Sequence, residues 1–67
     1  NGMLHSETHK LNSINYLTGV IEETYMNNFS VLVYDNEGGI FNEKFASTFE
    51  RAKAILQKMV YSAKSKY

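Results

Sequence analysis

Two histidines and a glutamate near the N-terminus are the first side chains in this 67-residue sequence whose spacing could do chemistry. His5 and His9 stand four residues apart around Glu7, a spacing that on a helix would place both imidazoles on one face as metal ligands. No further ligands follow nearby, and in the zinc-protease pattern the glutamate directly follows the first histidine. The chain also has no cysteine. We therefore predict no metal site.

A pair of carboxylates, Glu23 and Glu43, forms the second such group. In the strand register given below they flank Val31 at a separation of about 10 Å. An inverting glycosidase holds its acid and base about 6.5–9.5 Å apart, but a domain of this size has no cleft for a sugar around them. We interpret both as rim residues that reach water or meet Arg51 or Lys53. With no nucleophile set and no phosphate loop, the sequence predicts neither an enzyme nor a cofactor.

The charges of the chain are segregated, although the formal net charge is zero. Residues 1–46 carry a net charge of −4 and residues 47–67 a net charge of +4. We interpret this as an acidic sheet that complements a basic helix, and alternatively as a basic helix surface offered to an acidic partner. No apolar run approaches the roughly 18 residues of a membrane span, and the N-terminus lacks the apolar core of a signal peptide. We expect a cytoplasmic protein.

The elements that must position these groups begin with one amphipathic helix, predicted over residues 47–66. Ser47 and Glu50 have the spacing of a capping box. Behind that cap, the apolar residues fall within about 140° of one helix face. They are Phe49, Ala52, Ile55, Leu56, Met59, Val60 and Ala63.

Three extended runs precede the helix, at residues 15–25, 29–35 and 39–46. The second hairpin suits a three-residue loop with Gly38 at its left-handed position, which pairs Val33 with Phe41 and Val31 with Glu43. The first hairpin is predicted to turn over residues 26–28 with Asn28 in the left-handed position. We predict an α+β fold, a three-stranded antiparallel meander in the order 1-2-3 with the C-terminal helix packed on one face.

This register places a set of apolar residues under the helix. They are Leu17, Ile21, Tyr25, Phe29, Val31, Val33, Phe41 and Phe45. Residues 14–67 are predicted to form this single β-β-β-α domain, and residues 1–13 a flexible N-terminal segment. Asn1-Gly2 before Met3 has the form of an expression remnant.

The opposite sheet face is predicted to bind a partner, because one helix can cover only one side of a sheet. The row Val20–Tyr34–Ile40 would be wholly apolar there, which favours a homodimer or another protein partner. Alternatively, Met3, Leu4 and Leu11 fold back over this face. The candidate residues on it are Tyr16, Val20, Leu32, Tyr34 and Ile40, and a second candidate surface on the helix comprises Arg51, Lys58 and Tyr61.

A resemblance to a known family rests on the second strand and the helix. The residues that carry it are Phe29-Ser30-Val31-Leu32-Val33-Tyr34-Asp35, Gly38, Phe45, Ser47-Thr48, Ala52 and Ile55-Leu56. Together they resemble the arm-type, AP2-like DNA-binding domain at the N-terminus of phage tyrosine integrases. The resemblance implies that the sheet face away from the helix enters the major groove, through Tyr16, Thr18, Leu32, Tyr34, Asn42 and Lys44.

The predicted strands differ from that family, in which basic strand residues contact the phosphates. Here the strands contain one lysine and four acidic residues, Glu22, Glu23, Asp35 and Glu43. A weaker likeness, through residues 19–23 and 48–54, is to HicB-like antitoxin folds. We therefore predict a small non-enzymatic binding module of the kind that phages and mobile elements encode. It would act through protein–protein contacts, by self-association or by inhibiting or regulating a partner. The alternative is a DNA-binding module of the integrase arm-binding type.

Overall fold

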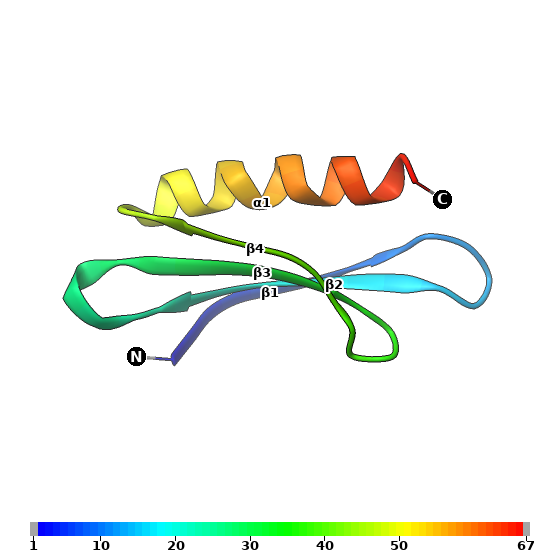
Figure 1. The fold of residues 1–67 in the computed structure, drawn as a ribbon, viewed down its shortest axis with the longest axis horizontal. Coiled ribbons are helices and arrows are strands. Elements are labelled where there is room, and N and C mark those ends of the chain that lie inside the picture. Colours follow the sequence, from blue (N-terminus) through cyan, green and yellow to red (C-terminus); the bar gives the residue numbers. More distant parts are fainter. Residues whose placement is uncertain (1, 67) are drawn as a thin grey trace.

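The computed structural model describes residues 2–66, except for the side chain of Asn27. One antiparallel sheet has the strand order β1-β2-β3-β4, and a single helix, α1, lies along one of its faces (Figure 1). The predicted α+β class and C-terminal helix are confirmed, but the sheet has four strands rather than three. The elements are β1 (Gly2–Lys10), β2 (Tyr16–Glu23), the 3-10 turn η1 (Tyr25–Asn27), β3 (Phe29–Asp35), β4 (Ile40–Ala46) and α1 (Phe49–Lys64).

The additional strand is β1, which occupies most of the segment predicted to be flexible and pairs along its length with β2. Asn1 of the expected remnant lies outside the described residues. His5, Glu7 and His9 point to the helix side of the sheet, while Ser6 and Thr8 point to the other side. Both sets are polar, so their alternation gives no hydrophobic signal of a strand. An edge strand can have such a sequence because little of it is buried.

The turn between β1 and β2 is built by one asparagine side chain. Asn12 Oδ1 accepts hydrogen bonds from the backbone N–H groups of Ile14 and Asn15, at 3.0 and 2.9 Å. The N–H of Leu11 donates to the carbonyl of Asn15 at 2.8 Å, which closes the hairpin. This is the local side-chain competition with the backbone that makes asparagine a common turn residue.

The hairpin between β2 and β3 turns one residue earlier than predicted. Thr24 N–H donates to the carbonyl of Asn28 at 2.8 Å, and the left-handed residue is Met26, with φ of 65°. Ile21 therefore pairs with Val31, which is two residues from the predicted register. Because side chains alternate with a period of two, this even shift leaves the predicted faces of β2 and β3 unchanged.

The hairpin between β3 and β4 has the predicted loop. Asp35 N–H donates to the carbonyl of Gly39 at 2.9 Å, and Gly38 takes the left-handed conformation with φ of 84°. The Asp35 carboxylate also accepts from the N–H groups of Glu37 and Gly39, at 2.9 and 2.8 Å. The expected three-residue loop is thus confirmed.

Beyond that loop a β-bulge at Phe41 shifts the register by one residue. Val33 pairs with Asn42 instead of Phe41, so every later residue of β4 changes face. Phe45, predicted to lie in the core, is 62% exposed on the face away from α1, and Glu43 lies on that face too. The predicted core position of Tyr25 is also wrong, because it lies exposed in the loop at η1.

The helix stripe is confirmed, but the cap is not the predicted one. Thr48 is the N-cap, and its Oγ1 accepts the backbone N–H of Arg51 at 3.1 Å, a role predicted for Ser47. Phe49 and Ile55 are partly buried at the edge of the core. The buried members of the stripe are Ala52, Leu56, Met59, Val60 and Ala63.

The helix approaches the sheet most closely over a glycine of β2. A Cβ atom built on Gly19 would lie 2.5 Å from Cδ1 of Leu56, so the absence of a side chain at Gly19 lets Leu56 lie directly on the sheet. Around this contact the sheet contributes Leu17, Ile21, Val31, Val33 and Ala46 to the core. Within residues 2–66, α1 is not long and apolar enough to span a bilayer.

Candidate functional site

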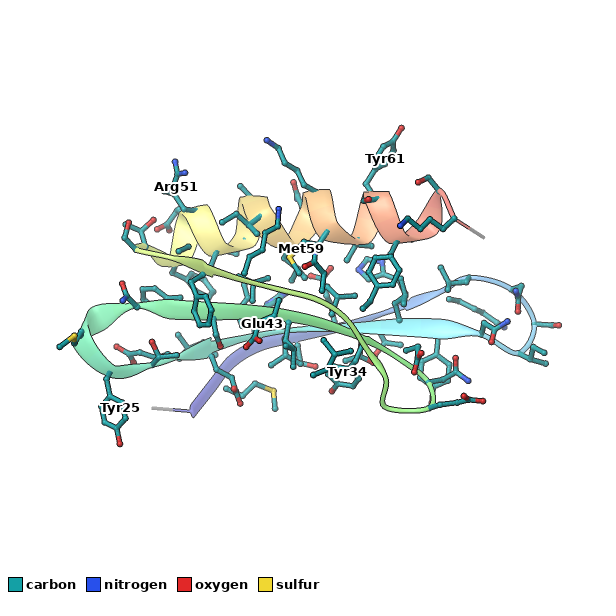
Figure 2. The ribbon with its side chains drawn as sticks, in the orientation of Figure 1. Tyr25, Tyr34, Glu43, Arg51, Met59 and Tyr61 are labelled. Carbon is teal, nitrogen blue, oxygen red and sulfur yellow. The ribbon has the colours of Figure 1, made fainter. Side chains whose placement is uncertain are left out.

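The sheet face opposite α1, here called the open face, holds all five residues predicted to bind a partner. Tyr16 and Ile40 are exposed, and Leu32 and Tyr34 are half-buried. Figure 2 shows the Tyr34 side chain on the side of the sheet away from the helix. Val20 is 7% exposed and forms part of the floor of this face rather than a protruding contact.

Three further apolar residues lie on or beside the open face, and none of them was among its predicted partner-binding residues. Met3 and Leu4 come from β1, and Phe45 comes from β4. All three are at least half exposed. The sequence gives no signal that places Phe45 on this face, because a bulge in β4 moves it there and no sequence rule locates such a bulge.

No element of residues 2–66 covers the open face. The alternative that the N-terminal segment folds back over it is wrong, because Met3 and Leu4 instead extend the sheet sideways as part of β1. Leu11 packs against the core. Figure 1 shows α1 on the other side of the sheet. The apolar residues of the open face are therefore accessible in the single chain.

The charges on the open face are separated along the strand direction. Lys10 lies at the end of the sheet where Tyr16 begins β2. Glu22 lies toward the other end, opposite Ser30, whereas Glu43 lies beside Leu32 on the edge strand β4. The centre is formed by the rows Thr18–Tyr34–Ile40 and Val20–Leu32–Glu43, which replace the predicted row Val20–Tyr34–Ile40.

Asn42 and Lys44, assigned by the resemblance to a DNA-reading face, lie instead on the helix side of β4. They line a hollow together with residues of α1. The predicted pair of carboxylates is separated in the same way, with Glu43 on the open face and Glu23 on the helix side of the sheet. The glutamates do not flank Val31 on one face, so they form no acid–base pair across it.

The second predicted surface, on the helix, is divided between two places. Arg51 and Lys58 line a shallow hollow with Ala54 and Ile55, and this hollow does not include Tyr61. Tyr61 is 78% exposed, and its side chain points away from the sheet near the far end of α1 (Figure 2). These three residues do not converge on one contact site.

A hollow of about 280 Å³ separates β1 from the C-terminal half of α1. His9 and Glu7 form one wall of this hollow, and Gln57, Val60, Tyr61 and Lys64 form the other. It lies where the helix does not reach the edge of the sheet.

The two histidines of β1 both bind the carboxylate of Glu7. His5 Nε2 lies 2.7 Å from Glu7 Oε1, and His9 Nε2 contacts Oε2. These hydrogen bonds, first from His5 and then from His9, hold the pKa of Glu7 below its ordinary value of 4.5. The three residues alternate along the strand β1 and therefore share one of its faces. Among residues 2–66, no group of three or more His, Cys, Asp or Glu side chains is arranged to hold a metal ion.

Comparison with known proteins found no match for this chain among protein-family models, curated proteins or solved structures.

Proposed function

We propose that this chain is a small binding module whose open face pairs with the open face of a second copy. The observation that carries the proposal is the uncovered apolar surface opposite α1, with Ile40 and Phe45 each more than half exposed. Contiguous apolar patches bordered by polar residues mark interaction sites on soluble domains. Lys10, Glu22 and Glu43 supply such a border.

Charge complementarity favours a second copy as the occupant. Two open faces can stack about a two-fold axis that lies in the interface and runs perpendicular to the strands. The ends of the two sheets are then exchanged, so Lys10 of one copy lies near Glu22 of the other. The same operation places Leu32 over Tyr34 of the second copy, at the apolar centre. An axis parallel to the strands would instead place the acidic ends together.

The size of the face indicates how strong this association should be. Four strands spaced about 4.8 Å apart, each about seven residues long at roughly 3.3 Å per residue, give a face of about 20 by 23 Å. A standard specific interface buries about 800 Å² on each partner. The open face, about 460 Å² by these dimensions, is smaller than that, so we expect a dimer that dissociates on dilution.

The integrase-like alternative has less support from the charges of this face. Phosphate contacts supply most of the affinity in protein–DNA complexes. Lys44, the strand lysine on which that mode would rely, lies on the helix side of β4. The open face keeps Lys10 against Glu22 and Glu43, and a groove-reading sheet with that balance would be repelled by DNA.

Size-exclusion chromatography with light scattering tests the proposal. We expect the wild-type protein to approach twice the 7.7 kDa mass of one chain at high concentration. Ile40→Lys combined with Phe45→Lys should give a folded monomer, because both side chains are exposed and neither faces α1. Tyr61→Lys is the control, since it places a lysine on an exposed position of the helix and should leave the dimer intact.

Two results would count against the pairing of open faces. One is a wild-type protein that stays monomeric at millimolar concentration. The other is a dimer that survives Ile40→Lys with Phe45→Lys but is lost in Tyr61→Lys. Salt-sensitive DNA binding that is lost in the open-face variant would support the integrase-like alternative instead.

A further inference from the structure

A second hollow, on the β4 side of α1, has the composition of an anion-binding site. Its volume is about 390 Å³, within the range of roughly 300–1,000 Å³ typical of small-molecule pockets. Two residues of edge strand β4 form one wall, and four residues of α1 form the other. They are Asn42 and Lys44, and Ile55, Lys58, Met59 and Ser62.

The bulge at Phe41 creates this hollow's polar wall. Without the extra residue, the next side chains of β4 would have the opposite orientation, and Glu43 would face the helix. With it, Asn42 and Lys44 face the helix and Glu43 faces the open side. Bulges commonly redirect side chains next to functional sites. Here the redirection exchanges a carboxylate for an ammonium group.

The polar groups that line the hollow can all donate hydrogen bonds. Lys44 and Lys58 contribute ammonium groups from facing elements, and Ser62 contributes a hydroxyl. Asn42 Oδ1 accepts the N–H of Glu43 at 2.8 Å, which leaves the amide N–H₂ of Asn42 as its unused group. Within residues 2–66, no carboxylate lines the hollow. Among the described residues, neither lysine has an ion-pair partner.

The remaining residues that line the hollow are apolar, and the neighbouring hollow contains a further positively charged side chain. Met59 is buried at the base of the hollow, and Ile55 is partly buried beside it. Ile55 and Lys58 also border the neighbouring shallow hollow, which ends at Arg51. A ligand here would meet donors and positive charge on one side and an apolar surface on the other.

We propose that this hollow binds the phosphate group of a small phosphorylated organic molecule. Lys44 and Lys58 bring two positive charges to the hollow from β4 and α1, and a phosphate between them would be attracted to both. Lysine binds phosphate as a point charge, and the Asn42 amide and Ser62 hydroxyl would satisfy further phosphate oxygens. Met59 and Ile55 would contact the organic part. This site does not involve the open face, and it holds whether or not the chain forms a dimer.

A nuclear magnetic resonance titration at constant ionic strength tests the site, with inorganic phosphate and a nucleoside monophosphate as the probes. We expect saturable shifts of the backbone signals of Asn42, Lys44, Lys58 and Ser62, with tighter binding of the nucleotide because it also covers Met59. Lys44→Gln and Lys58→Gln should each weaken binding about tenfold, the loss of one charge-assisted hydrogen bond.

Lys53→Gln is the matched control, because Lys53 is an exposed helix lysine that lies 5.5 Å from the centre of the Phe49 ring, away from the hollow. It should leave the affinity unchanged. Equal losses in all three variants, or equal shifts on adding chloride, would overturn the proposal. Binding of single-stranded DNA or of vesicles with anionic lipid, without binding of either small probe, would also overturn it in favour of a diffuse basic surface.

Discussion

The contact between Gly19 and Leu56 predicts an energetic coupling between the sheet and the helix. A methyl group on Gly19 would lie 2.5 Å from Leu56 Cδ1, far inside van der Waals contact. Leu56 is itself buried among the core residues of α1, so its side chain has little room to move aside. We therefore expect Gly19→Ala to destabilise the fold by overpacking, although alanine restricts the unfolded chain more than glycine does.

The magnitudes follow from the burial of both sites. Overpacking a tight core costs about 1–3 kcal/mol, which we expect for Gly19→Ala. Leu56→Ala removes a side chain that is 1% exposed, and comparable changes cost about 2–5 kcal/mol. In the double variant, the new methyl group fills part of the space that Leu56 vacated. Its total cost should therefore be lower than the sum of the single costs by at least about 1 kcal/mol.

Urea unfolding followed by circular dichroism measures all three free energies. Thr18→Ala is the control, because Thr18 is the neighbour of Gly19 on the same strand but lies on the open face. It should show no coupling with Leu56→Ala. Costs that add to within about 0.5 kcal/mol for Gly19 and Leu56 would refute the close approach of helix and sheet.

Three other predictions concern local features. Gly38→Val should destabilise the fold by at least about 1 kcal/mol in urea unfolding, because Gly38 has φ of 84°, while Glu37→Ala should have little effect; equal effects would argue against this loop. Thr48→Ala should cost about 1 kcal/mol and Thr48→Ser much less, and equal losses would exclude Thr48 as the cap. The lowered pKa of Glu7 means that its contribution to stability is present above about pH 4.5 and lost as the pH falls through that lowered pKa. Melting temperatures below pH 4.5 should therefore fall less steeply in Glu7→Gln than in the wild type, and identical slopes would contradict this.

The helix and the faces of β2 and β3 could be predicted from the sequence because apolar periodicity determines them. The stripe from Ala52 to Ala63 has a period of 3.6 residues, and Ile21 and Val31 keep their faces even though the hairpin register differs by two. Gly38 was predictable for a different reason, since a left-handed turn position strongly favours glycine.

The strand β1 and the bulge in β4 could not be predicted, for two separate physical reasons. From His5 to Lys10 both faces of β1 are polar, and the helix-side residues are held by the hydrogen bonds of His5 and His9 to Glu7 instead of by apolar burial. In β4, Phe41 and Phe45 are an even number of residues apart, so strand periodicity places both on the buried face. Only the pairing with β3 reveals the extra residue of the bulge. The bulge determines the candidate sites, because it moves Phe45 to the open face and Lys44 to the basic hollow.

The pairing of two open faces is tested most directly by an isotope-filtered nuclear Overhauser measurement on a mixture of labelled and unlabelled protein at millimolar concentration. Only contacts between different copies give signals in this experiment. We predict a contact between the methyl groups of Leu32 and the ring of Tyr34 from another copy. Intermolecular signals confined to residues of α1, or no intermolecular signal at all, would contradict the proposed function.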